Sequence, residues 1–522
     1  MKILFVSAVS ACFELENDAP YYAPEPFRVT VDGRTLPEQT ANVFSVFGLK
    51  PDTKYTVLAE GAQFTDSVEF TTAKERCAVD VTAFGAKGDG VTENTAAIQA
   101  AVNFLPKGGR LFFPAGTYLT LPVALKSHMT VEFAEGAVLL GSTERKRYPV
   151  IPSVTPDLGG GEEVFFGTFE GNTMTMYQSL LSAAYAEDIT IIGPGTVDGN
   201  AQNSDFWTAF KQDPIARPRL LFFNRCKNIT VHGIKACNSA SWQLHPFFTD
   251  HISFFDVSVS APKISPNTDA LDPESCDDVQ IIGCKFTVGD DCIAIKSGKI
   301  ELGERFNKSA DHHTIRNCLM AFGHGAVTLG SEIGAGVKNL SVSQCWFQGT
   351  DRGLRIKTRR GRGKNCRIEH VEFSNIRMEN VLTPFVINMY YNCCDPDKDS
   401  EYVWSREALP VDDRTPHLGS FHFTDIECTG TQVAVCSIEG LPEMPVEEVE
   451  FRNVSVRFAE DAKPGVPAMK AFSEPIACGG LDLGYVKKVR IENVSLEGVR
   501  GEKLKTKFCG EVVTEGFEAG GK

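Results

Sequence analysis

The chain has 522 residues, of which 42% are hydrophobic and 23% are charged, and its formal net charge is −15. This length predicts a large core and a second, smaller domain. The acidic balance argues against a general role on nucleic acid or on anionic membranes, so we expect neither as a partner. An acidic substrate would need a local basic patch.

The 16 cysteines predict a reduced interior rather than a disulfide framework or a metal centre. Most of them stand singly inside apolar runs, as Cys318 and Cys345 do, and there is no CxxC pair. Cys393 and Cys394 are adjacent and poorly placed to bind one metal ion. We therefore expect buried thiols in a reducing compartment, with no metal and no cofactor.

The first residues have two interpretations. The run from Ile3 to Cys12 is apolar, and Val9-Ser-Ala-Cys12 resembles a lipoprotein cleavage box. However, the apolar stretch is only about nine residues long, and a domain that follows directly needs it as its first strand. We predict a cytoplasmic protein, with a secreted protein or a lipoprotein as the alternative. No other stretch approaches the length of a membrane span.

Residues 1–75 are predicted to form a small β-sandwich. Short alternating runs such as Phe27–Val31 and Tyr55–Leu58 are separated by turn residues, including Asp32-Gly33. The stretch 48–57, followed by Phe70-Thr-Thr, resembles the late strands of fibronectin type III domains. We expect this domain to serve in packing or spacing.

The residue pattern changes at residue 78, and a second domain spanning 78–515 is predicted. After one helical segment at 94–102, short β-rich units recur without helices between them, which excludes a doubly wound α/β fold. Counted from Ile229, the equivalent positions follow at intervals of 23, 27, 36, 25 and 28 residues, namely Ile252, Val279, Ile315, Leu340 and Ile368. This quasi-period predicts an all-β parallel β-helix, with an extra loop near 299–308.

Four polar motifs are spaced by about one coil each. They are Asn267-Thr-Asp269, Gly289-Asp-Asp291, Gly323-His324-Gly325 and Arg355-Ile-Lys357. Because neighbouring coils lie about 4.8 Å apart, these side chains are expected to converge in one cleft. Singly, each motif is more typical of a turn or a charged surface. In one register, three carboxyl groups, an imidazole and two cations form a candidate active site.

The motif set resembles the polygalacturonase family, glycoside hydrolase family 28, from about residue 78 to 500. The resemblance implies a right-handed parallel β-helix and hydrolysis of galacturonate linkages by single displacement with inversion. It also implies that Asp290 is the general acid, that Asp269 and Asp291 together activate water, and that His324 supports the acid. Glycosidic cleavage needs one protonated and one ionised carboxyl, in agreement with this assignment.

The same resemblance implies the substrate contacts. Arg355 and Lys357 leave the same face of one strand and look like the pair that binds a galacturonate carboxylate. Asn267 is expected to orient the aspartates, and Tyr390 or Tyr391 to supply an aromatic contact. Rhamnogalacturonan hydrolases of the family tend to lack the histidine and the Arg/Lys pair, so galacturonate is favoured on both sides of the cut.

Exo attack on pectic oligosaccharides is favoured over endo attack. The insertions near 143–180, 299–310, 392–416 and 458–482 exceed what a minimal β-helix needs and could close the groove. The alternatives are a hydrolase of rhamnogalacturonan or of pectin side chains, a non-catalytic β-helix that binds polysaccharide, and a pectate lyase, which would need Ca²⁺.

Overall fold

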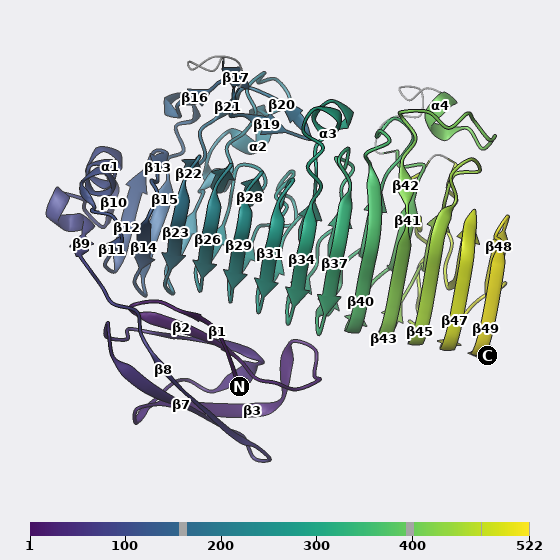
Figure 1. Cartoon of the computed structure of the whole chain (residues 1–522), viewed down its shortest axis with the longest axis horizontal. Helices are drawn as coiled ribbons and strands as arrows, with labels where there is room; N and C mark the ends of the chain where they lie inside the picture. Colours follow the sequence, from purple (N-terminus) through teal and green to yellow (C-terminus); the bar gives the residue numbers. More distant parts are fainter. Residues whose placement is uncertain (156–163, 393–400, 471, 521–522) are drawn as a thin grey trace.

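The computed structural model describes residues 1–155, 164–392, 401–470 and 472–520. It has two parts, a small β-sandwich and a long parallel β-helix that lies beside it (Figure 1). The last strand of the sandwich ends at Thr71, and the first strand of the β-helix begins at Ala78. No helix in these described ranges is long and apolar enough to cross a lipid bilayer.

The sandwich consists of two antiparallel sheets around the aromatic rings of Phe13, Phe27 and Phe44. The first sheet contains β1 (Lys2–Val6), β2 (Ser10–Glu14) and β6 (Val43–Phe47). The second contains β3 (Tyr22–Val31), β4 (Arg34–Thr35), β5 (Gln39–Ala41), β7 (Lys54–Glu60) and β8 (Thr65–Thr71). The apolar run at the N-terminus thus forms a strand pair inside the domain. The resemblance to fibronectin type III stays a prediction.

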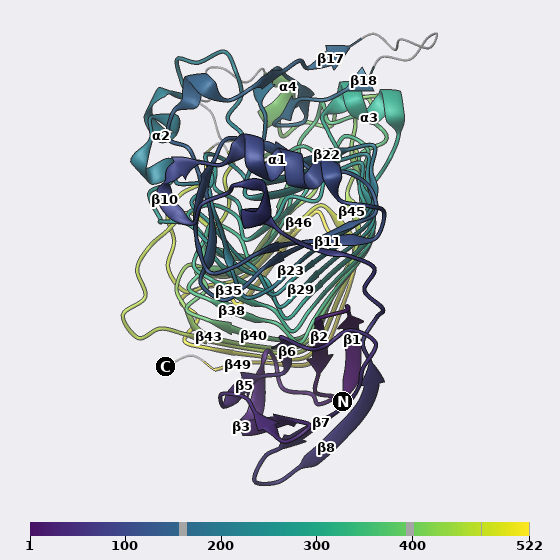
Figure 2. The same cartoon turned by 90° about the vertical axis from the view of Figure 1, so that its left-hand side faces the viewer.

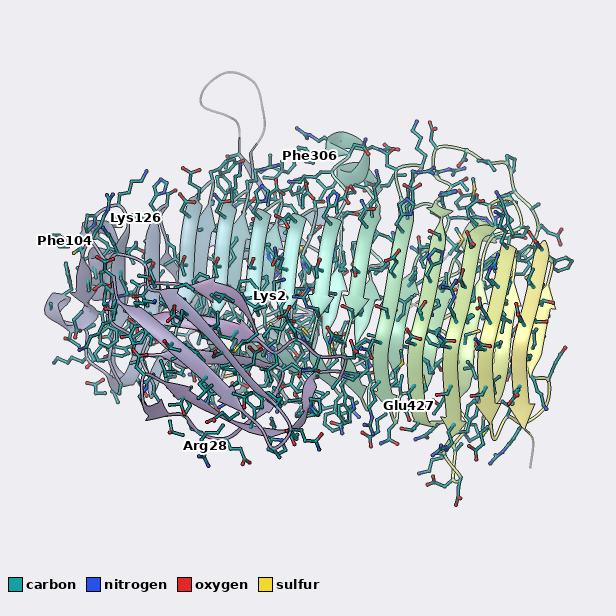
Figure 3. All side chains as sticks on the ribbon, turned by 60° about the horizontal axis from the view of Figure 1, so that its bottom comes forward. Lys2, Arg28, Phe104, Lys126, Phe306 and Glu427 are labelled. Carbon is teal, nitrogen blue, oxygen red and sulfur yellow. The ribbon has the colours of Figure 1, made fainter. Side chains whose placement is uncertain are left out.

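The sandwich packs on one corner of the β-helix through both apolar and polar contacts. Glu14 accepts hydrogen bonds from Nε and Nη2 of Arg316 at 2.7 and 2.8 Å and from Asn317 at 2.7 Å. Val43 packs with Phe255 from the β-helix. Figure 3 looks toward this face, where the sandwich covers the middle coils and leaves the coils around Glu427 open. This arrangement agrees with a packing role.

Two faces of the β-helix form one sheet of 24 strands. The first face carries β9 (Ala78–Asp80), β11 (Gly109–Phe113), β14 (Met129–Phe133), β23 (Glu187–Ile192), β26 (Lys227–His232), β29 (Asp250–Phe255), β31 (Asp277–Ile282), β34 (Asp311–Arg316) and β37 (Val337–Ser343). The second carries β10 (Asp89–Glu93), β12 (Gly116–Thr120), β15 (Ala137–Gly141), β24 (Thr196–Asp198), β27 (Lys235–Cys237), β30 (Ser258–Ser260), β32 (Lys285–Thr287), β35 (Leu319–Ala321) and β38 (Trp346–Gln348). In the last coils, long strands span both faces, namely β40 (Arg367–Glu379), β42 (His417–Leu418) with β43 (Ser420–Thr431), β45 (Val446–Phe458), β47 (Val486–Glu497) and β49 (Glu511–Gly520).

The third face carries the candidate site and consists of two sheets. The first comprises β13 (Val123–Ala124), β22 (Leu181–Ala184), β25 (Leu221–Asn224) and β28 (Leu244–Phe247). The second comprises β33 (Ile293–Ile295), β36 (Val327–Leu329), β39 (Arg352–Lys357), β41 (Thr383–Asn388), β44 (Ala434–Glu439), β46 (Gly479–Gly484) and β48 (Leu504–Lys507). Leu271 bridges to both Leu244 and Ile293 and makes the face continuous.

Helices occur at one end and in the insertions. The helix α1 (Thr95–Phe104) closes the N-terminal end of the coil stack, as the view along the axis shows (Figure 2). The insertion at 143–180 adds β16 (Val150–Ile151), β17 (Val154–Thr155), β18 (Val164–Phe165), β19 (Thr168–Phe169), β20 (Asn172–Thr173) and β21 (Met176–Tyr177). The helix α3 (Ile300–Phe306) lies in the insertion near 299–310 and α4 (Glu401–Trp404) in the one at 392–416, whereas α2 (Phe206–Ala209) lies between β24 and β25, outside the predicted insertions. Cys393 and Cys394, and residues 156–163 of the first insertion, lie outside the described residues.

The β-helix is confirmed, but two of the predicted equivalent positions, Ile315 and Ile368, are wrong. Val279 pairs with His313 rather than with Ile315, and Leu340 pairs with Val371 rather than with Ile368. Most first-face strands have a left-handed residue just before an inward residue, such as His312 (φ 50°) before His313, and the long strand β40 has His370 (φ 57°) before Val371. His313 fills an inward position with only 1% of its surface exposed, so a search for apolar residues passed over it.

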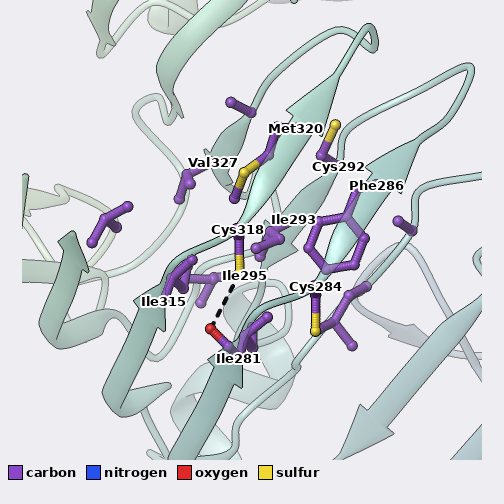
Figure 4. Close-up of a cluster of buried hydrophobic side chains, with 14 of the residues drawn as sticks. Ile281, Cys284, Phe286, Cys292, Ile293, Ile295, Ile315, Cys318, Met320 and Val327 are labelled. Atoms are coloured by element: carbon purple, nitrogen blue, oxygen red, sulfur yellow. Dashed lines mark hydrogen bonds between the residues drawn. The ribbon is translucent and has the colours of Figure 1, made fainter. Parts of the chain in front are cut away.

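The core is one continuous stack of inward side chains, as the close-up of Ile281, Phe286, Ile315 and their neighbours shows (Figure 4). All 14 described cysteines are free, and most are buried, as predicted. The thiol of Cys318 donates a hydrogen bond to the carbonyl of Ile281 at 3.3 Å. These thiols therefore fill space between coils.

Candidate active site

Backbone hydrogen bonds between successive coils bring the four motifs together at the start of the third face. Ala270 N donates to the carbonyl of Asp291 at 3.0 Å, and Cys292 N donates to the carbonyl of Gly325 at 2.8 Å. One coil further on, Thr328 pairs with Arg355. The motifs therefore lie in neighbouring coils on one strip, as the spacing predicted.

The three aspartates form one cluster. One oxygen from each of Asp269, Asp290 and Asp291 lies within 4.8 Å of the other two. Asp291 is fully buried and Asp269 is 4% exposed, whereas Asp290 is half-buried. Negative charges this close in a poorly hydrated place cannot all be stabilised equally, so the surrounding cations decide which carboxyl stays ionised.

Asp291 is the aspartate that the cations hold in the ionised form. Its Oδ1 accepts a hydrogen bond from Nη1 of Arg355 at 2.9 Å, and its Oδ2 accepts one from Nζ of Lys357 at 2.8 Å. Burial by itself would raise the pKa of Asp291, but Lys357 and Arg355 outweigh it and hold the pKa below the ordinary value. The two cations predicted to bind substrate thus also bind an aspartate of the site.

The pKa of Asp269 is shifted in the opposite direction to that of Asp291. Burial is the main cause that raises its pKa well above the ordinary value, and the nearby carboxyls of Asp290 and Asp272 raise it further. The opposing cation is Lys296, whose Nζ lies 3.9 Å from Oδ2 of Asp269. Two members of one cluster therefore differ strongly in proton affinity.

Asp290, the third member of the cluster, lies next to His324 in the neighbouring coil. The backbone N–H of His324 donates to the carbonyl of Asp290 at 3.0 Å, and the Nδ1 of His324 lies 2.8 Å from Oδ2 of Asp351. The hydrogen bond with Asp351 raises the pKa of His324 above its ordinary value, so the imidazole keeps its proton to higher pH. Asp351 is a site residue that the motif search missed.

Two glycines of the motifs are required by close approach. A Cβ on Gly289 would lie 2.7 Å from the carbonyl oxygen of Pro262, and a Cβ on Gly325 would lie 2.9 Å from Oδ1 of Asp291. Since real Cβ atoms do not approach other atoms this closely, any side chain at these positions would displace the loops that carry the aspartates.

The remaining predicted residues separate into two groups. Asn267 faces the site, where its Oδ1 accepts a hydrogen bond from Nη2 of Arg217 at 2.7 Å. Tyr391 lines the cavity, with the Nζ of Lys357 located 5.8 Å from its ring centroid. Tyr390 is buried below the surface, where Arg406 stacks on it at 3.8 Å, and it does not line the cavity. Of the two tyrosines, the geometry thus favours Tyr391.

The site opens into a cavity of about 760 Å³. It is lined by Glu170, Trp242, Asn267, Asp269, Asp290, Lys296, Lys299, His324, Ser331, Glu332, Asp351, Arg352, Arg355, Lys357, Arg359, Arg362, Tyr391 and Met469. Seven of these are Lys or Arg, so an otherwise acidic protein concentrates positive charge here. Five of them come from the basic run 352–364. Arg355 and Lys357 were predicted from their motif, whereas the basic composition of the run was the only sequence signal for the other three.

The insertions supply part of the cavity lining. Glu170 belongs to the turn of the β19–β20 hairpin, and the carbonyl of Gly171 in that turn accepts a hydrogen bond from Lys299 N at 2.9 Å. Met469 comes from the insertion near 458–482, and its Sδ lies 2.6 Å from Nη2 of Arg355. The length of an insertion does not reveal where its residues lie, so sequence reasoning missed these contacts.

The aspartate cluster has the spacing of a possible cation site, as do three groups of histidine and carboxylates on other faces of the described chain. At the aspartates, however, ammonium and guanidinium groups from Lys296, Arg355 and Lys357 already offset the negative charge. We assign no metal ion to this site.

Comparisons with known proteins agree with this picture. The family described as Glycosyl hydrolases family 28 matches residues 160–464, and a rhamnogalacturonase A/epimerase, pectate lyase-like family matches 78–144. A probable polygalacturonase of Vitis vinifera is 30% identical over 441 residues, which make up 82% of this chain and 85% of the relative.

Solved structures extend the likeness to the fold. A hyperthermoactive exopolygalacturonase of Thermotoga maritima has a TM-score of 0.66 at 26% identity, covering 82% of this chain and 93% of that one. A family 28 exopolygalacturonase of Yersinia enterocolitica has a TM-score of 0.71 over 98% of both chains, and its 19% identity supports the fold alone. With the matching residues extending over more than half of its length, the chain belongs to glycoside hydrolase family 28.

Proposed function

We propose that this protein hydrolyses the α-1,4 linkages of polygalacturonate or oligogalacturonates and removes sugars from a chain end. The observation that carries the proposal is a cluster of three carboxyls at a cation-lined cavity, in which the pKa of Asp269 is raised and that of Asp291 is lowered. Hydrolysis of a glycosidic bond needs such a pair, with one carboxyl to give a proton and another to take one from water.

Asp290 serves as the general acid. It is the most accessible of the three aspartates, and it lines the cavity next to His324. A protonated His324 beside it supplies a positive charge as the leaving oxygen develops negative charge. Asp290 is therefore placed to protonate the glycosidic oxygen.

Asp269 and Asp291 have different roles in activating the attacking water. Both oxygens of Asp291 are engaged by cations, and its depressed pKa makes it a weak base. Asp269 has the higher pKa and binds a proton more strongly. We assign proton removal to Asp269, whereas Asp291 orients the water and anchors Arg355 and Lys357.

The cavity suits a polyanion with a free end. Arg355, Lys357 and Arg362 present cations to carboxylates of the substrate, and the hairpin with Glu170 and the segment with Met469 contribute to the cavity lining. Binding a chain end in such a cavity favours release of short products. The relatives named as exopolygalacturonases support this mode of attack.

Replacement of Asp290 by Asn tests the proposal. The variant should lose release of reducing sugar from polygalacturonate by at least about 100-fold, since an amide cannot act as the acid. Asp278→Asn, on the outer side of β31, is the matched control and should keep full activity. Unchanged turnover in Asp290→Asn would contradict the assignment.

The same assay distinguishes the alternatives. A lyase would form unsaturated products that absorb in the ultraviolet and would stop when a chelator is added, and a binding protein would release nothing. NMR of the first product gives the anomer. Inversion is predicted, although the carboxyl oxygens lie closer than the separation of about 6.5–9.5 Å that is common in inverting enzymes.

A further inference from the structure

A buried lysine lies directly beneath the aspartates. Lys296 follows β33, and the neighbouring coil fixes its backbone, because Lys296 N donates to the carbonyl of Pro273 at 2.9 Å and Ser275 N donates to the carbonyl of Lys296 at 2.8 Å. Only 3% of Lys296 is exposed. Its Nζ lies 4.3 Å from the centroid of the Trp242 ring. This ammonium group therefore has almost no access to water.

Three carboxyls share this single ammonium group. The Nζ of Lys296 lies 3.2 Å from Asp272, 3.4 Å from Glu332 and 3.9 Å from Asp269. Asp272 is fully buried, and neither of its carboxyl oxygens has a hydrogen-bond partner with good geometry. Because one charge cannot fully offset three, the carboxyls compete for Lys296.

Other charged groups complete the surroundings. His245 contacts Glu274. Six further charged groups act electrostatically on members of this cluster, namely Asp290, Asp291, Glu274, Arg217, Arg219 and Lys357. Burial raises the pKa of Asp272 to about 7, while Lys296 opposes that effect. Burial would also raise the pKa of Glu332, but Lys296 and Lys357 lower it to about 2. Glu332 thus stays ionised. Asp269 and Asp272, whose pKa values are both raised, are the two carboxyls of this cluster that can bind a proton.

We propose that Lys296 is a positioning residue that favours the ionised form of Asp269, the base, against the effects of burial and of the neighbouring carboxyls. We also propose that Asp272 sets how much of the positive charge of Lys296 is available to Asp269. A proton on Asp272 removes one competitor and leaves the ammonium group to Asp269. Loss of the ammonium group leaves Asp269 beside uncompensated carboxyls and favours its protonated form. This inference rests on the proposed hydrolysis, with Asp269 as the base.

The test is the pH dependence of kcat/KM for polygalacturonate hydrolysis in two variants with opposite expectations. In Lys296→Met, the acidic limb should move to higher pH by about one unit or more, because an opposite charge within about 4–6 Å has been removed. In Asp272→Asn, the limb should move to lower pH, because a like charge has been removed. Lys285→Met, exposed on β32, is the control and should leave the limb in place.

The outcomes separate the two ideas. A wild-type protein that releases no reducing sugar would overturn the proposed function and this inference together. An active wild-type protein whose two variants lose activity equally at every pH would overturn the inference alone, since a purely structural lysine lowers the profile without moving it. If Lys296→Met does not fold, the test rests on Asp272→Asn. The proposal is refuted if the acidic limb of Asp272→Asn stays in place or moves to higher pH.

Discussion

Gly325→Ala is expected to disable the site through a single methyl group. The φ of Gly325 is not in the left-handed region, so its backbone would accept alanine. The obstacle is space, because the new Cβ would overlap Oγ1 of Thr328 and lie 2.9 Å from Oδ1 of Asp291. Asp291 cannot retreat without loosening its contacts with Arg355 and Lys357.

The magnitude follows from this crowding. Thr328 is fully buried and β-branched, so its side chain has little freedom to turn away. Overpacking of this kind costs about 1–3 kcal/mol in the free energy of unfolding. A displacement of several tenths of an ångström at Asp291 should lower kcat/KM by roughly 10- to 100-fold, because catalysis depends steeply on the placement of reacting groups.

Denaturant unfolding and initial rates of reducing-sugar release measure the two effects. The control is Gly484→Ala at the end of β46, where the nearest atom to a new Cβ is Cγ of Glu439 at 3.7 Å, an ordinary contact. The double variant Gly325→Ala/Thr328→Ala should recover stability but only part of the activity, since the contact with Asp291 remains. The reasoning is refuted if Gly325→Ala is as active as Gly484→Ala.

Two further predictions concern protonation and product length. Asp351→Asn removes the carboxylate that raises the pKa of His324, so the imidazole should lose its proton at lower pH and the alkaline limb of kcat/KM should move down. The side chains of His324 and Asp351 are 50% and 41% exposed, so an interaction of about 0.5–1 kcal/mol is expected, which corresponds to a shift of about half a pH unit. An alkaline limb that does not move would mean that His324 does not control it. Glu170→Ala should open one margin of the cavity and increase the share of dimers among the first products, measured by chromatography, and an unchanged product pattern would exclude the β19–β20 hairpin from control of product length.

The repeat and the motif order could be predicted from the sequence. Coils stack on their neighbours, so equivalent residues recur along the chain, and polar motifs one coil apart must meet. For this reason the placement of Asp269, Asp290, Asp291 and His324 followed from their spacing. The predicted register was wrong at Ile315 and Ile368. His313 interrupts the apolar pattern, and in the longer coils no residue pattern indicates which position is equivalent to the one in the preceding coil.

Contacts between distant parts of the chain were decided only by the tertiary structure. Arg355 and Lys357 are identifiable as cations in the sequence, but only the fold reveals that both bind Asp291. Lys296 follows an apolar strand and carries no motif of its own, yet it faces three carboxyls. A repeat pattern defines which coil a residue belongs to, whereas the neighbours of a buried charge depend on how side chains and insertions pack across coils. The sequence by itself therefore determined the fold and predicted the candidate reacting groups, and the packing decided the charged surroundings that shift the pKa values of Asp269 and Asp291.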